Sequence, residues 1–114
     1  MSIQQWSDSI QVVDLSDDPA FTDDLATLTD NIEAKPTDVV LNFASVGFIN
    51  SSNVARLLRL RKKMMALSRR LVLCEASSQV WSVFLVTGLD KIFEFSDDVA
   101  NALASLQLNK RAEP

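Results

Sequence analysis

The chain has no histidine, no tyrosine and a single cysteine among its 114 residues. Without histidine it has no imidazole to act as a general base or as a zinc ligand, and one cysteine cannot form an internal disulfide. The two glycines, Gly47 and Gly88, are too few for a Walker A loop or a GxGxxG dinucleotide motif. We therefore expect no catalytic residues, no metal site and no cofactor.

Long apolar runs are also missing, since runs such as 39–41 and 83–86 are far shorter than the roughly 18 residues that cross a bilayer. The first residues lack a basic segment followed by an apolar stretch, so no secretory signal and a cytoplasmic location are expected. With 47% hydrophobic and 23% charged residues, the composition is that of an ordinary globular chain. We expect one domain over residues 1–114, with 109–114 as a frayed tail.

Charge is unevenly distributed behind the net value of −4. Residues 1–38 hold nine acidic residues and one base, whereas residues 53–70 hold seven bases and no acid. The acidic remainder of the chain and a pI near 4.6 oppose direct nucleic-acid binding. The basic segment is therefore either a solvated helix face neutralised by acidic neighbours or a surface that contacts another protein.

Strand-like and helix-like patterns alternate along the chain. Strands are predicted at 10–15, 39–43, 71–74 and 92–95, with a short strand at 3–6 paired to the first. Helices are predicted from Pro19 to 34 with Asp18 as N-cap, from Ser51 or Ser52 onward, from a Ser77 cap to Gly88, and after a Ser96 cap. This order predicts an α/β sandwich around a largely parallel sheet.

Apolar stripes indicate which face of each helix is buried. The helix over 19–34 should bury Phe21, Leu25, Leu28 and Ile32, and the next should bury Val54, Leu57, Leu58, Leu60, Met64 and Met65. The third should bury Val80, Trp81, Phe84 and Leu85, and the last Val99, Leu103 and Leu106. Arg61 falls within an apolar stripe and must extend to solvent or find a partner, and Cys74 is expected to be a buried small hydrophobe. Trp6 could be exposed for contact or pack over the sheet.

The turn at 44–52 carries the one polar constellation of interest: Asn50, Ser51, Ser52 and Asn53. It follows a buried strand and begins a helix, at the sheet edge where α/β proteins tend to bind ligands. All four side chains are good helix caps, so simple capping explains them. Alternatively, one hydroxyl is a phosphorylation site, because the helix dipole and Arg56 would favour an added phosphate that repels an acidic partner.

The chain resembles the STAS domain family of bacterial anti-sigma-factor antagonists in the order and spacing of five features. These are an apolar strand, a Phe-Ile-Asn-Ser-Ser turn over 48–52, a leucine-rich helix, the strand 71–74 and a helix ending at Thr87, Gly88 and Leu89. The resemblance covers residues 39–104 well and the first third loosely. It implies a mixed, mostly parallel sheet of four to five strands with about four helices mainly on one face. It also implies a regulator of transcription that is not an enzyme.

In the phosphorylated members of that family, a turn similar to Asp-Ser-Ser-Gly carries the modified serine. The resemblance assigns that role to Ser51, with Ser52 as the second serine, and it implies a GHKL-type anti-sigma kinase and a metal-dependent phosphatase as partners. Asn50 replaces the aspartate and Asn53 the glycine, while 14–18 replaces a Gly-Glu-Leu-Asp-like stretch. Together with the turn, the partner-binding surface is expected to include Arg56, Arg59 and Lys63.

Two alternatives remain. The chain could be a STAS scaffold that is never phosphorylated, or an accessory subunit of an ABC transporter, as the asparagines at 50 and 53 suggest. A small enzyme using paired carboxylates, either Asp17 with Asp18 or Asp97 with Asp98, is disfavoured because adjacent acids at helix starts usually cap the helix and complement its dipole.

Overall fold

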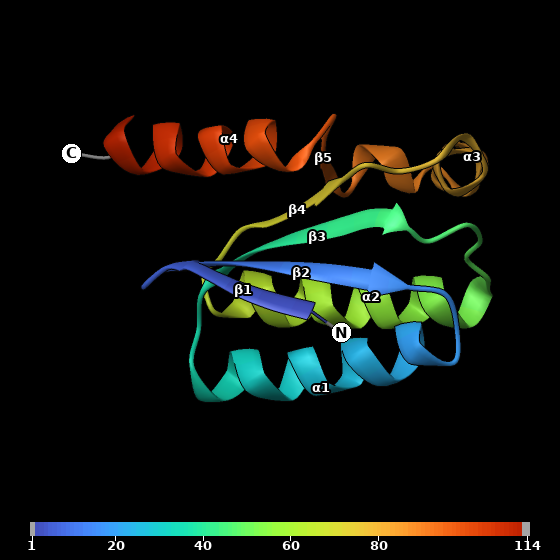
Figure 1. Cartoon of the computed structure of the whole chain (residues 1–114), viewed down its shortest axis with the longest axis horizontal. Coiled ribbons are helices and arrows are strands. Elements are labelled where there is room, and N and C mark those ends of the chain that lie inside the picture. The colour runs from blue at the N-terminus through green and yellow to red at the C-terminus, as the bar shows by residue number, and fades with distance from the viewer. Residues whose placement is uncertain (1, 113–114) are drawn as a thin grey trace.

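The computed structural model describes the backbone of residues 2–112 and the side chains of residues 2–108. Within that range, strands and helices alternate as the pattern predicted (Figure 1). The elements are β1 (Ser2–Ser7), β2 (Ile10–Ser16), α1 (Ala20–Ala34), β3 (Asp38–Ser45), α2 (Ser51–Ala66), β4 (Leu71–Cys74), α3 (Ser78–Thr87), the short 3₁₀ helix η1 (Leu89–Lys91), β5 (Glu94–Ser96) and α4 (Val99–Ala112). The predicted tail, 109–114, overlaps the end of α4, and its last two residues lie outside the described range.

The strands form one sheet in the order β1-β2-β3-β4-β5. β1 pairs with β2, as predicted, and the structure shows this pair to be antiparallel, whereas every other pair is parallel. Val12, Val40 and Val72 are register partners across the three central strands. Because the parallel strands end at the same edge, the loops after β2 and β3 lie beside each other at that edge (Figure 1).

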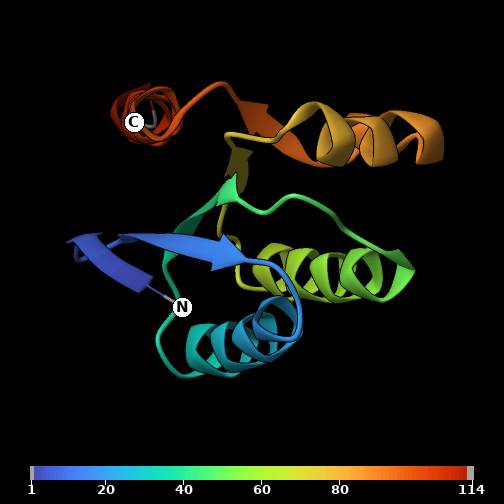
Figure 2. The same ribbon diagram turned by 45° about the vertical axis from the view of Figure 1, so that its right-hand side comes forward.

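Helices cover both faces of the sheet, three on one side and one on the other. On β2, Val13 and Leu15 belong to the larger core, which α1, α2 and α3 close with residues such as Leu28, Leu57 and Phe84. Ile10 and Val12 belong to a smaller core closed by Ala102 and Leu106 of α4. Figure 2 shows α4 on the opposite side of the sheet from α1 and α2. The expected sandwich, with helices mainly on one face, is confirmed.

The buried stripe of α1 is confirmed, since its four predicted apolar residues are at most 1% exposed. Its amino-terminal cap was predicted one residue too early. The helix begins at Ala20, Pro19 takes the cap position, and Asp18 lies one residue before it. The Asp18 Oδ1 atom nevertheless accepts hydrogen bonds from the Thr22 backbone N–H at 2.9 Å and from the Thr22 hydroxyl at 2.7 Å. Asp18 therefore stabilises the first turn from outside the helix.

The prediction of burial is wrong for three residues on α2 and α3. Leu58, Met65 and Leu85 are 37%, 60% and 50% exposed. Each lies beside the narrower set that faces the sheet, which on α2 is Asn53, Leu57, Leu60 and Met64 and on α3 is Val80 and Phe84. A polar residue, Asn53, takes a place in the buried row where the pattern expected only apolar ones.

Trp81 is half-buried against the core and meets Phe95 edge to face, with ring centroids 4.7 Å apart. Trp6 is 38% exposed on β1. Arg61 has found a partner, because its Nε atom donates to the Ile92 carbonyl at 3.3 Å.

The region before α4 differs from the prediction. β5 begins at Glu94 rather than Ile92, because η1 and a turn precede it. Ser96 is the last residue of β5 and does not cap α4. Asp98 does so, since its Oδ1 atom accepts the Asn101 N–H at 2.8 Å. The Ser77 cap of α3 is confirmed, with its hydroxyl accepting the Val80 N–H at 3.2 Å. Among the described residues, no helix has the length and apolarity needed to cross a membrane.

Candidate functional site

The candidate site is the start of α2 together with the β3–α2 turn, residues 46–50. An acidic residue from the neighbouring loop holds this turn: the Asp17 Oδ1 atom accepts the Gly47 N–H at 2.9 Å and the Phe48 N–H at 3.4 Å. Val46 and Ile49 anchor the turn in the core at 2% exposure each, whereas Phe48 between them is 65% exposed. The turn is thus fixed on both sides and presents one aromatic ring to solvent.

The two asparagines perform the capping. The Asn50 side chain accepts the Asn53 N–H at 2.9 Å, and the Asn53 Oδ1 atom accepts the Asn50 N–H at 3.0 Å. This reciprocal pair is a capping box, which satisfies two backbone donors that a helix start leaves unpaired. Asn53 also donates from Nδ2 to Asp18 Oδ2 at 2.8 Å and is only 2% exposed. The Asn53 side chain is therefore used within the fold.

The two serines have no part in the cap. Ser51 and Ser52 are the first two residues of α2, both are exposed, and neither side chain makes a hydrogen bond within the described part of the chain. Capping therefore accounts for two of the four polar residues and leaves both hydroxyls available to solvent. The sequence pattern alone could not divide the four residues in this way.

The basic residues Arg56, Arg59 and Lys63 lie on the side of α2 that neighbours α1. Lys63 Nζ forms an ion pair with Glu33 Oε1 at 2.6 Å. Arg56 and Arg59 line a groove of about 310 Å³ whose other wall comes from α1, at Ala26, Thr29 and Asp30. Neutralisation by acidic neighbours thus explains part of the basic segment. Arg59 is exposed and Arg56 half-buried, so both remain accessible from the groove.

Two pKa shifts describe the electrostatics around the fold. The side-chain hydrogen bonds from Asn53 and Thr22 lower the pKa of the Asp18 carboxyl, which keeps it charged beside the start of α2. Burial raises the pKa of the Cys74 thiol to about 12, and nearby carboxylates add to the effect. Cys74 is therefore the buried small hydrophobe that its surroundings predicted, without the character of a reactive thiolate.

Three of the four paired acids have structural partners. Asp17 holds the β3–α2 turn, Asp18 holds the first turn of α1, and Asp98 caps α4. No group of three or more metal-ligating side chains occurs in the part of the chain that the structure describes. The link between Asp17, Asp18 and the β3–α2 turn was not predicted from the sequence. Two features of the sequence could have indicated this link: a pair of acids before one helix and an asparagine-rich turn before the next.

Comparison with known proteins identifies this architecture. The family model of the STAS domain matches residues 12–102. No curated protein sequence matches the chain. A serine-to-glutamate variant of RsbS from Moorella thermoacetica is similar with a TM-score of 0.83 at 18% identity, covering 96% of this chain and 97% of that one.

Two further solved structures extend the comparison. The phosphorylated form of the Bacillus cell fate determinant SpoIIAA gives a TM-score of 0.72 at 21% identity, covering 92% of this chain and 97% of that one. A sulfate transporter family protein from Wolinella succinogenes gives 0.72 at 19% identity, covering 88% and 84%. At these identities the structural likeness shows the fold alone. Because the family model spans most of the sequence, the chain belongs to the STAS domain family.

Proposed function

We propose that this protein is a partner-switching regulator of the anti-sigma-factor antagonist kind. Unmodified, it binds a GHKL-type anti-sigma factor with serine kinase activity, and phosphorylation of Ser51 ends that binding. A metal-dependent phosphatase would restore the binding form. The observation that carries the proposal is the exposed Ser51 hydroxyl, which is free of capping because Asn50 and Asn53 form the capping box.

The physical effect of a phosphate at Ser51 follows from its position. It would add about −1.5 to −2 charges at neutral pH to the first residue of α2. The helix dipole and nearby backbone N–H groups tolerate that charge within the protein, so the fold would persist. An acidic surface on the partner would be repelled, and the carboxylates of Asp17 and Asp18, which lie beside the turn, would add to the repulsion.

The surroundings of Ser51 suit a protein contact. Phe48 is the most exposed aromatic side chain among the described residues, and it precedes Asn50 of the same turn and Ser52 at the start of α2. An exposed aromatic ring with a polar rim is the usual composition of an interface centre. Anti-sigma factor antagonists among proteins of the same fold, including one solved in its phosphorylated form, support the same interpretation.

Affinity capture from a lysate of the source organism tests the proposal, with four baits: the wild type, Ser51→Ala, Ser51→Asp and Ser52→Asp. The wild type and Ser51→Ala should retain a GHKL-type kinase, and Ser51→Asp should lose it. Ser52→Asp places the same charge one residue further on and should weaken capture less. Equal capture by Ser51→Ala and Ser51→Asp would exclude the switch.

A second candidate is a STAS scaffold without a switch, such as an accessory subunit of a transporter. The presence of Asn50 where phosphorylated members have an aspartate favours it, and so does the fold shared with a sulfate transporter family protein. This candidate predicts that all four baits capture the same transporter ATPase or permease equally well.

A further inference from the structure

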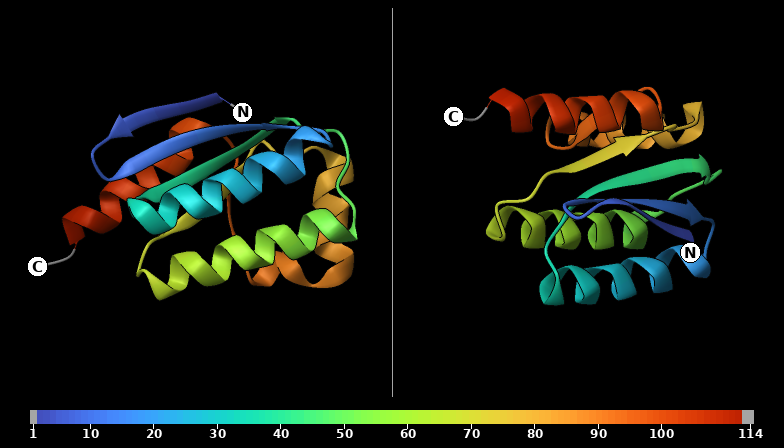
Figure 3. Two further views of the ribbon diagram at one scale, coloured as in Figure 1. Left: turned by 90° about the horizontal axis from the view of Figure 1, so that it is seen from below. Right: turned by 60° about the vertical axis from the view of Figure 1, so that its left-hand side comes forward.

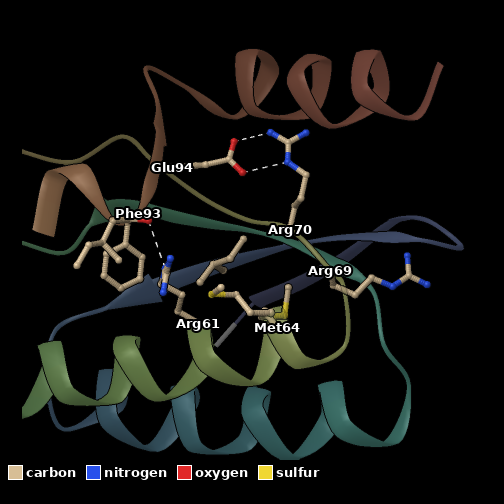
Figure 4. Close-up of a pocket in the computed structure, with 9 residues that line it drawn as sticks. Arg61, Met64, Arg69, Arg70, Phe93 and Glu94 are labelled. Atoms are coloured by element: carbon tan, nitrogen blue, oxygen red, sulfur yellow. Dashed lines mark hydrogen bonds and ion pairs between the residues drawn. The ribbon is translucent and has the colours of Figure 1, made fainter. Parts of the chain in front are cut away.

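A second pocket lies at the other end of α2, between its carboxyl-terminal half and the segment that leads into β5. Figure 4 shows it beneath the ion pair between Arg70 and Glu94. Its volume is about 210 Å³ and it is open to solvent on one side. Two arginines and four apolar side chains make up most of its lining: Arg61, Arg69, Met64, Met65, Ile92 and Phe93. We call it the Arg61–Arg69 groove.

The wall of this groove is rigid. Arg70 donates from Nε to Glu94 Oε1 at 3.0 Å, and its Nη2 atom pairs with the other oxygen of the same carboxylate. The same guanidinium reaches across to α4, where it donates to the Ser105 carbonyl and hydroxyl at 3.2 Å each. All three guanidinium nitrogens of Arg70 are thus engaged, and four of its five N–H donors are used. This arginine is therefore mainly a structural part of the wall.

The other two arginines are differently placed. Arg61 uses only Nε, toward the Ile92 carbonyl, and both of its terminal nitrogens are without a hydrogen bond within the described residues. The Arg69 side chain makes no hydrogen bond or ion pair there either. In Figure 4 the two guanidinium groups lie on either side of Met64. Two half-buried cations therefore flank an apolar floor and have no acid between them.

The floor offers apolar area that the fold leaves uncovered. Met64 and Phe93 are buried at 1% and 5%, but Met65 and Ile92 are 60% and 43% exposed. Methionine is flexible and polarisable, which suits a surface that adapts to different apolar side chains. The groove volume of about 210 Å³ leaves room for an apolar side chain, with an arginine at each end for its acidic neighbours.

We propose that the Arg61–Arg69 groove is a second protein-docking site, which takes a short acidic segment with an apolar residue between its carboxylates. Charge decides the class of partner: residues 53–70 carry seven bases and no acid, and Glu94, the one acid in the lining, is already paired with Arg70. Guanidinium groups bind carboxylates in a planar, two-point geometry, and the exposed methionine and isoleucine cover the apolar residue.

This site is separate from Ser51. α2 has 16 residues, and at about 1.5 Å per residue its two ends are some 24 Å apart. A phosphate at one end is therefore screened from the groove at physiological ionic strength, where the Debye length is about 8 Å. The protein can therefore keep an acidic segment bound in the groove while the partner at Ser51 binds and dissociates.

The test uses a defined probe, an acetylated and amidated Glu-Asp-Phe-Glu-Asp peptide, titrated into the ¹⁵N-labelled protein. Saturable chemical-shift changes should map to Met65, Arg69 and Ile92 and should weaken as salt is raised. The neutral peptide Gln-Asn-Phe-Gln-Asn should cause none. Arg69→Gln, which breaks no side-chain hydrogen bond or ion pair among the described residues, should weaken binding about tenfold or more. Lys62→Gln removes the same charge from an exposed neighbour outside the lining and should change the affinity less than twofold.

Three outcomes would overturn the proposal: shifts confined to the groove beside Arg56 and Arg59, equal weakening by Lys62→Gln, or no response to the acidic peptide. Stronger binding to anionic phospholipid vesicles than to the peptide, lost in Arg69→Gln, would assign the groove to a membrane surface and would also overturn it. Ser51→Asp should bind the peptide as the wild type does, so a failed switch at Ser51 and a failed groove give different results.

Discussion

Asn53 is the residue on which the geometry of the β3–α2 turn depends most. It closes the capping box with Asn50 and connects α2 to Asp18, which is 35 positions earlier in the chain. The sequence predicted a polar helix start, but it did not predict which of the polar residues would cap the helix. That choice depends on the carboxylate of Asp18, which the fold brings next to Asn53. The hydroxyl of Ser51 is free of capping because Asn50 and Asn53 form the capping box.

Asn53→Ala should destabilise the fold by about 1–3 kcal/mol, because it leaves the Asn50 N–H and a charged carboxylate without their buried partner. Urea unfolding followed by circular dichroism measures the change. Ser52→Ala removes an exposed hydroxyl that makes no hydrogen bond and should stay within about 0.5 kcal/mol of the wild type. If the two variants are equally stable, the capping box contributes nothing.

Asp18 makes the free energy of unfolding depend on pH in the acidic range. Its folded-state pKa lies below the ordinary value of 3.8 because Asn53 and Thr22 donate to the carboxylate. On acidification the unfolded chain takes up this proton first, so the stabilisation is present above 3.8 and is lost as the pH falls through the folded-state pKa. Asp18→Asn should have a shallower loss of unfolding free energy between about pH 5 and pH 2.5 than the wild type.

The matched control for this prediction is Asp8→Asn, in the β1–β2 turn. It removes an exposed carboxyl whose side chain makes no hydrogen bond within the described residues. Its unfolding free energy should follow the wild-type pH profile. Identical profiles for Asp18→Asn and the wild type would contradict the assignment.

At the scale of elements, periodicity predicted the buried faces well and the element ends less well. The α1 stripe is confirmed because four apolar residues at helical spacing have only one way to meet a sheet. The start of β5 and the cap of α4 were wrong because local contacts made after folding decide them. Ser96 pairs with Cys74 in the sheet, which leaves the cap to Asp98. Leu58 and Met65 were misplaced because the sheet accepts a narrower stripe than the sequence offers.

The end of α3 supplies a test at this scale. Gly88 has φ 75°, a left-handed conformation that disfavours any residue with a Cβ. Gly88→Ala should cost about 1 kcal/mol of unfolding free energy. Gly47→Ala is the matched control, since its Cβ would meet only Asp17 Oδ2 at 3.8 Å, an ordinary contact. A larger loss at Gly47 than at Gly88 would show that the turn before α2, rather than the helix end, limits stability.

At the scale of the whole molecule, Cys74 reports on the integrity of the sheet. It is fully buried in β4 between β3 and β5, and its thiol has a pKa raised to about 12 by burial. A thiol reagent at neutral pH should therefore label the native protein only as fast as the molecule opens, and at once in urea. Rapid labelling of the native protein would show that β4 opens without global unfolding.

The molecule as a whole places two candidate binding surfaces at opposite ends of α2, on a fold whose other helices are fixed against the sheet. Figure 3 shows α1 and α2 running side by side beneath the strands, with α4 across the sheet from them. The STAS architecture was predictable from the order of strands and helices, whereas the groove at Arg61 and Arg69 was not. Its lining comes from α2, from residues 69–71 and from residues 92–94. The last of these segments is far from the other two in the sequence and comes next to them only in the folded protein.

The most direct measurement of the central claim is the dissociation constant of the complex with the captured kinase, for the unmodified protein and for the protein phosphorylated at Ser51, the site verified by fragmentation mass spectrometry. We predict that the phosphorylated protein binds at least tenfold more weakly, which is about 1.4 kcal/mol. Equal dissociation constants for the two forms would contradict the account.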